Sequence, residues 1–132
     1  MKGKWLGLIA ICAAAFSVAG CSTGQRLVSI ALQPSGGFVF EGPGAQGQFT
    51  AIGTYIHPPE NKDVSTQVTW SLDIANFGTL TQTGLITYSR TDGCGSGNVT
   101  ATFHNPPGSP AGSVISGSAP VSGANNGTAT CQ

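Results

Sequence analysis

Short segments in which apolar and polar residues alternate, each broken by glycine or proline, make up most of this chain. Alternation with a period of two is typical of β-strands that bury one face. The clearest segments are 27–34, 48–55, 67–73 and 98–104. Beyond the first twenty residues, no segment has the 3.6-residue period of an amphipathic helix. The sequence therefore predicts an all-β fold made of short strands.

Six or seven such strands with turns between them favour a β-sandwich. The stretch 57–63 is expected to be a loop because its two prolines fix φ and remove donors, and the Gly-rich stretches 41–47 and 90–97 are also expected to be irregular. Trp70 is expected at the centre of the core, since a large ring in mid-strand buries much apolar area. The predicted core residues are Val28, Ile30, Leu32, Phe49, Ala51, Val68, Trp70, Leu72, Leu85, Val99, Ala101 and Phe103.

The first twenty residues have the composition of an export signal. Lys2 and Lys4 precede an apolar run, Trp5 to Ala19, that is too short to span a bilayer. Its small residues end in Val18-Ala19-Gly20-Cys21, which resembles the lipobox of bacterial lipoproteins. The resemblance implies that the signal is cleaved before Cys21, that the thiol receives a diacylglycerol, and that the new amine is acylated, for example with palmitate.

Two or more acyl chains anchor a protein stably to a membrane, so we expect a cell-envelope protein held through Cys21. Ser22 stands where such lipoproteins often carry an aspartate as a retention signal, which favours the outer membrane in an organism that has one. The alternatives are a plain secretory signal with a chance cysteine and an uncleaved anchor.

The chain is expected to divide into a signal peptide (1–20), a lipidated tether (21–26), one domain (27–121) and a Gly/Asn-rich tail (122–132). Charged residues are 8% of the whole chain, against about 25% in an average soluble protein. Three basic and five acidic residues remain after the signal, a formal charge of −2. The sequence has no cluster of basic residues that would form a positive patch, which argues against a nucleic-acid partner.

The order of the strand-like motifs resembles a known family, the bacterial immunoglobulin-like domains of group 2 found in invasin- and intimin-type surface proteins. The motifs are Val28–Pro34, Gly47–Ala51, Val68–Leu72, Gly78–Leu80, Gly84–Ile86 and Gly97–Thr102. The resemblance covers residues 27–121 and implies an immunoglobulin-like sandwich of about seven strands with a role in adhesion or as a spacer. It implies no catalytic residues. Cys94 and the long polar loop 57–66 depart from the family pattern.

Two cysteines, Cys94 and Cys131, remain once Cys12 leaves with the signal and Cys21 is lipidated. An even pair in an oxidising compartment predicts a disulfide. In a seven-stranded sandwich the loop before the sixth strand also shares a pole with the end of the seventh, so the tail can reach across. The alternatives are two unpaired thiols and a bridge to another protein.

Metal binding and catalysis have little support in the sequence. His57 and His104 are expected at one pole, but a metal there would need a third ligand. Asp73 and Asp92 are expected at the opposite pole without the dense oxygen ligands of a calcium loop. Neither histidine has an evident acid partner or a nucleophile elbow, so no Ser–His–Asp triad is expected. We therefore expect no metal, no cofactor and no enzyme.

The expected function is a lipid-anchored, non-catalytic binding, adhesion or structural module. Its partners would be the membrane, through the lipid, and an envelope or extracellular protein or glycan. The alternatives are an accessory subunit of a larger envelope assembly and a small hydrolase, which would need a cleft lined by ionisable groups. The short tether places loops 57–66 and 105–112 near the membrane. We expect the partner site at the opposite pole, where Cys94 lies, or along a sheet edge.

Overall fold

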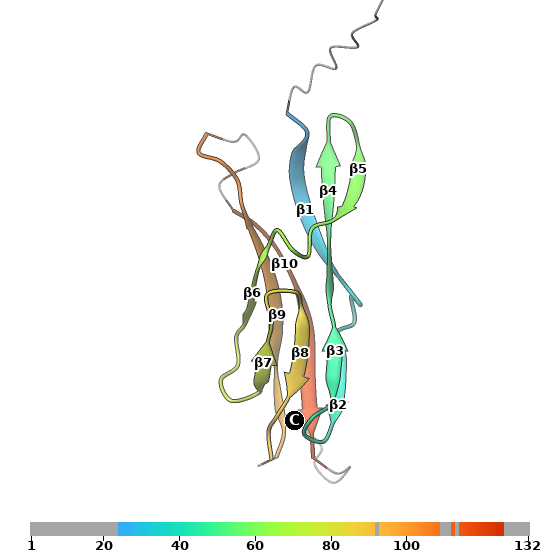
Figure 1. The fold of residues 1–132 in the computed structure, drawn as a ribbon, viewed down its shortest axis with the longest axis vertical. Coiled ribbons are helices and arrows are strands. Elements are labelled where there is room, and N and C mark those ends of the chain that lie inside the picture. The colour runs from blue at the N-terminus through green and yellow to red at the C-terminus, as the bar shows by residue number, and fades with distance from the viewer. Residues whose placement is uncertain (1–23, 92, 109–111, 113, 126–132) are drawn as a thin grey trace, which may run out of the picture.

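The computed structural model describes residues 24–91, 93–108, 112 and 114–125, and all of its regular structure is β-strand (Figure 1). The predictions for the signal peptide, Cys21, Cys131 and residues 126–132 fall outside these described residues. The strands of the described part are β1 (Arg26–Gln33), β2 (Phe38–Glu41), β3 (Gln46–Gln48), β4 (Thr50–Ile56), β5 (Glu60–Asp63), β6 (Thr69–Leu72), β7 (Gly78–Leu80), β8 (Leu85–Tyr88), β9 (Gly95–His104) and β10 (Val114–Ala124).

The strands form three sheets, with the orders β1-β4-β5, β2-β10-β9-β6 and β3-β8-β7. Only Phe49 separates β3 from β4, so the first and third sheets are continuous along the chain. The four-stranded sheet packs against them: Phe40 of β2 stacks on Tyr88 of β8, with ring centroids 6.0 Å apart. Trp70 of β6 lies against Gly84, just before β8. The predicted all-β, sandwich-like fold is therefore confirmed.

The chain changes layer between β1 and β2. β1 pairs antiparallel with β4, whereas β2 pairs in parallel with β10. In the turn between them the Gly37 amide donates to the Pro34 carbonyl over 3.1 Å. Gly37 has a φ of 72°, and a Cβ there would lie 1.6 Å from the Pro120 carbonyl oxygen. Glycine is therefore required where the chain crosses from one sheet to the other.

The core lies between the layers and largely matches the alternation in the sequence. Eight of the twelve predicted residues are buried, and Leu72 and Phe103 are half-buried against them. The buried residues are Leu27, Ile30, Leu32, Phe40, Phe49, Ala51, Val64, Val68, Trp70, Phe77, Ile86, Tyr88, Val99, Ala101, Ile115, Ala119 and Val121.

The prediction for Val28 is wrong, because its side chain is 37% exposed. The pairing of β1 with β4 shifts register between Leu27 and Ser29, which places Val28 in a β-bulge. A bulge inserts one unpaired residue and reverses the alternation beyond it. Leu27 therefore takes the core position that Val28 would hold in a regular strand, while Ile30 stays buried.

The prediction for Leu85 is also wrong, because β8 faces the core with the other half of its residues. Ile86 and Tyr88 are fully buried, whereas Leu85 is half-buried. The inward face starts at Gly84, where the absence of a side chain lets the Trp70 ring approach the backbone. The close packing of Trp70 therefore determines the phase of this strand.

Stretches that were expected to be loops contribute strand residues. β5 lies within 57–63 and pairs with β4, from Tyr55 opposite Glu60 to Ile52 opposite Asp63. The two prolines occupy the hairpin turn before β5, where they take no donor from the ladder. Gln46 and Gly47 likewise belong to β3, and β9 begins at Gly95. The described residues therefore form ten strands, more than the seven expected.

Candidate binding surfaces

The domain is elongated and has two distinct ends (Figure 1). The tether pole holds the start of β1, the β4–β5 hairpin and the loop from β9 to β10, with Arg26 opposite Ile56 and Val114 opposite His104. The far pole holds the β2–β3 turn, the segment before β9 and the end of β10. β10 has 11 residues and rises about 3.3 Å per residue, so the poles lie roughly 35 Å apart.

At the tether pole, the first described residues are fixed to the β4–β5 hairpin. Gln25 Nε2 donates to Glu60 Oε2 over 2.8 Å, and Lys62 Nζ donates to Gln25 Oε1 over 2.7 Å. Lys62 also pairs with Glu60 at 3.2 Å and lies 5.2 Å from the centroid of the Tyr55 ring. The hydrogen bond from Gln25, followed by that from Lys62, lowers the pKa of Glu60. These contacts fix the direction in which the chain enters β1.

The far pole is packed by an aromatic cluster. Phe77 and Tyr88 meet edge to face at 4.9 Å, and Phe40 lies 6.0 Å from each of them. The buried Tyr88 hydroxyl donates to the Gly93 carbonyl over 3.0 Å, which holds the segment that carries Cys94. A Cβ on Gly123 would lie 2.4 Å from the Tyr88 ring, so β10 passes directly against it.

This packing sets the surroundings of the predicted disulfide. Cys94 precedes Gly95, which is paired with Gly123 near the end of β10. Cys94 is not a free thiol in the structure. Cys131 lies outside the described residues, seven positions beyond Ala124, the last residue of β10. The pairing of Cys94 with Cys131 therefore stays a prediction.

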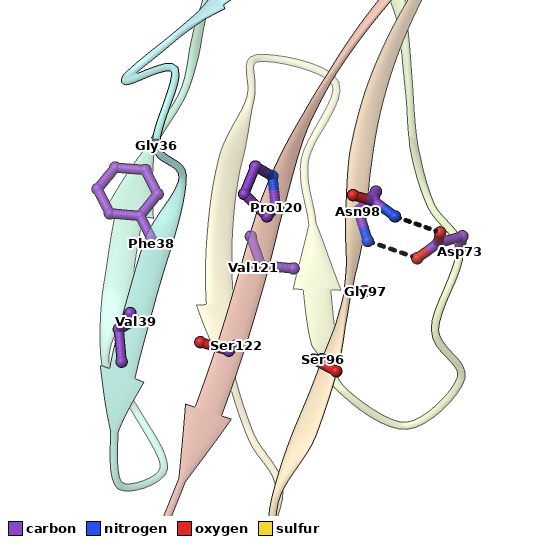
Figure 2. A pocket seen from close by; sticks show the side chains of 10 residues that line it. All are labelled: Gly36, Phe38, Val39, Asp73, Ser96, Gly97, Asn98, Pro120, Val121 and Ser122. Atoms are coloured by element: carbon purple, nitrogen blue, oxygen red, sulfur yellow. Dashed lines mark hydrogen bonds between the residues drawn. The ribbon is translucent and has the colours of Figure 1, made fainter. Parts of the chain in front are cut away.

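A shallow depression, the sheet groove, crosses the outer face of the four-stranded sheet (Figure 2). Its volume is about 630 Å³. Pro120 and Ser122 of β10 lie along its middle, Val39 of β2 borders one side, and Asp73 with Asn98 borders the other. Val39 is 77% exposed, the highest value among the exposed large hydrophobic side chains of the described residues. The groove therefore presents apolar and hydrogen-bonding groups side by side.

Asp73 serves as a structural acceptor on one side of the sheet groove. Its Oδ1 accepts from the Asn98 amide over 2.6 Å, and its Oδ2 accepts from Asn98 Nδ2 over 3.1 Å (Figure 2). The bond from the Asn98 backbone, followed by that from its side chain, lowers the pKa of Asp73. The carboxylate stays ionised and ties the end of β6 to β9. Asp92, its expected neighbour, is outside the described residues.

A second depression, the tether-pole cleft, opens between the layers next to the start of β1. Its volume is about 490 Å³. Leu27 and Tyr55 line it from one layer, and Phe103 with Pro106 and Pro107 line it from the other. Gly24, Gln25, Arg26, Asn105 and Gly108 complete the lining. The cleft is mainly apolar and contains one cationic side chain.

The other candidate residues are placed separately. His57 is exposed in the β4–β5 turn and His104 ends β9 at the same pole. Across the described residues, no group of three His, Cys, Asp or Glu side chains is arranged to hold a metal. The described part of the chain also contains no helix with the length and hydropathy that a membrane crossing requires.

Comparison with known proteins adds no family assignment: no family model and no curated protein sequence matches the chain. The resemblance to group 2 immunoglobulin-like domains therefore depends on the motifs themselves.

Sequence reasoning did not identify either depression. Each is lined by residues from segments far apart in the chain, such as Val39 with Asn98, or Arg26 with Pro107. The available signals were Val39, an apolar residue in a short segment between two glycine-rich turns, and the Pro106-Pro107 pair beside His104.

Proposed function

We propose that this chain is a lipid-anchored envelope protein whose immunoglobulin-like domain is a non-catalytic binding module. The lipid is carried by Cys21, and the partner binds along β2 and the sheet groove. The strand order supports an immunoglobulin-like assignment. One layer has the order β7, β8, β3/β4 and β1, and the other has the order β6, β9, β10 and β2. Apart from β2 and from β5, which pairs with β4, this is the strand order of seven-stranded immunoglobulin sandwiches.

The single observation that carries the binding role is the open edge of β2 beside the sheet groove. Among the described residues, β10 is the only strand that pairs with β2. An unpaired strand edge offers backbone donors and acceptors to an extended segment of another protein. Val39 is 77% exposed on this strand and supplies an apolar contact.

Another edge of the same sheet is closed by a side chain. The Gln82 amide accepts from the Trp70 backbone N–H at 3.3 Å and donates to the Trp70 carbonyl at 3.4 Å. Gln82 thus covers the outward backbone groups of Trp70, at one of the four residues of β6. This contrast favours β2 as the edge that receives a partner.

Site-specific photocross-linking tests the binding role. A photoreactive phenylalanine at Val39, in the full-length protein in its own cells, should give a discrete cross-linked product. The same group at Val114, which is 51% exposed at the tether pole, is the matched control. Cross-linking that is absent at Val39, or equal at both positions, contradicts the proposal.

The anchor is tested separately. Cys21→Ser should leave an unprocessed or soluble protein, because the lipid and the cleavage site are both lost. A variant that matures normally and stays with membranes after a carbonate wash contradicts the lipoprotein assignment.

The disulfide is tested by mass spectrometry of the non-reduced, protease-digested protein. A peptide joining Cys94 to Cys131 is expected, and such a bridge would stabilise the fold by about 4 kcal/mol in the chain-entropy model. Free thiols at both positions contradict it.

A further inference from the structure

We propose that the tether-pole cleft binds one anionic phospholipid of the membrane that holds the anchor. The headgroup phosphate would lie at Arg26, and part of an acyl chain would lie along Leu27, Tyr55 and Phe103. This inference rests on the proposed function, because the lipid on Cys21 is what brings the cleft to a membrane.

The cleft lies a short chain distance from the anchor. Gly24 lines the cleft and is three residues beyond Cys21. Three residues span at most about 11 Å even when fully extended. The contacts of Gln25 with Glu60 and Lys62 fix the chain just beyond this point. A lipid on Cys21 would therefore hold the mouth of the cleft at the membrane surface.

Arg26 carries an unsatisfied donor. The Nε of Arg26 is buried and has no hydrogen-bond partner in the structure. Buried polar atoms without a partner are rare in folded proteins, and each requires an explanation. A guanidinium group binds phosphate oxygens through several parallel N–H donors. Because this Nε is closed to solvent, Arg26 would turn its guanidinium group into the cleft to present the donor to a phosphate.

Charged residues are unevenly distributed around the cleft. Among the described residues, Arg26 lies toward the tether pole together with three charged residues of β5, which are Glu60, Lys62 and Asp63, so these charges sum to zero. The described acids Glu41 and Asp73 lie farther along the domain, at the end of β2 and just after β6. The tether pole is therefore close to neutral, but the lining of the cleft contains Arg26 and no carboxylate, and this local positive charge suits an anionic headgroup.

The rest of the cleft lining is mainly apolar. Leu27 is buried at 2% exposure, and Tyr55 and Phe103 are half-buried. Pro106 and Pro107 are exposed beside them. An apolar cleft with a single cation fits an amphiphile that has one anionic group better than it fits a free anion.

The test is native mass spectrometry of the full mature lipoprotein, purified in a neutral detergent and titrated with phosphatidylglycerol. One adduct per chain is expected at concentrations where phosphatidylcholine gives none. Arg26→Gln should weaken this adduct at least tenfold. The matched control Arg90→Gln removes a cation beside Gly95, away from the cleft, and should change binding less than twofold.

A second pair of variants tests the apolar lining without touching Arg26. Pro107→Asp places a negative charge in the cleft and should abolish the adduct, whereas Pro59→Asp, in the neighbouring hairpin turn, should not. Equal losses for Arg26→Gln and Arg90→Gln would show a general surface-charge effect and overturn the proposal. Competition by inorganic phosphate, or equal binding of phosphatidylcholine, would also overturn it.

The same spectra separate this inference from the proposed function. The denatured intact mass shows whether Cys21 carries a covalent lipid. An unlipidated chain refutes the anchor, whereas a lipidated chain without a phosphatidylglycerol adduct refutes only the cleft.

Discussion

Replacing Trp70 with alanine tests the packing between the layers most directly. Trp70 is 4% exposed, its ring lies against Gly84, and its Nε1 donates to the Ser65 carbonyl over 2.9 Å. Losing a buried large aromatic side chain costs about 3–5 kcal/mol. Losing the indole hydrogen bond adds about 1 kcal/mol. Small domains have about 5–15 kcal/mol of stability in total, so a large share of it would be lost.

The measurement is urea and thermal unfolding of the mature protein, followed by far-UV circular dichroism because Trp70 is the only tryptophan after the signal peptide. At about 4 °C per kcal/mol, the lower limit of 3 kcal/mol lowers Tm by about 12 °C. Trp70→Phe keeps a ring in the core and loses the indole donor, so it should lose less than half as much. A Trp70→Ala protein that melts within about 2 °C of wild type would refute this account of the core.

Three further changes probe other parts of the structure. Tyr88→Phe removes the hydroxyl that holds the loop before β9 and should cost about 0.5–1.5 kcal/mol in urea unfolding, and no change would show that the bond is unimportant. Gly84→Ala places a Cβ 2.6 Å from a backbone carbonyl oxygen at a φ of 86°, whereas Gly44→Ala has a φ of 89° in open surroundings. The first should therefore lose about 1–3 kcal/mol more than the second, and equal losses would contradict the steric argument. Because the pKa of Asp73 is lowered by Asn98, its contribution to stability is complete above the pKa of the unfolded chain and is lost as the pH falls through the folded value. Unfolding measured from about pH 5 to pH 2 should therefore show a weaker dependence in Asp73→Asn than in wild type, and identical slopes would contradict it.

Alternation predicted the fold class and most of the core because most strands are regular over the segments used. It failed at Val28, where a bulge that depends on the pairing with β4 shifts the pattern by one residue. It failed at Leu85 because hydrophobicity alone predicts that this leucine faces the core. The contact between Trp70 and Gly84 instead directs the opposite face of β8 toward the core. These errors come from tertiary pairing, which a single sequence does not contain.

The far-pole aromatic cluster was also not predicted from the sequence. Phe40, Phe77 and Tyr88 belong to three short segments that are separated by many residues, and none was predicted in the core. Their burial follows from the parallel pairing of β2 with β10, a long-range contact without a local sequence signal. The two depressions were missed for the same reason, whereas the grouping of loops at each pole followed from strand order alone.

The pairing of β1 also determines how the domain would respond to mechanical force. β1 pairs with β4 from Arg26 to Gln33, along the long axis of the molecule (Figure 1). A pull between the N-terminal end of β1 and a partner on the far pole acts along the strand. The hydrogen bonds of the ladder are then loaded in shear and must break together, whereas a perpendicular pull would open them one at a time. The strand that enters the fold first is thus positioned to carry tension along the domain.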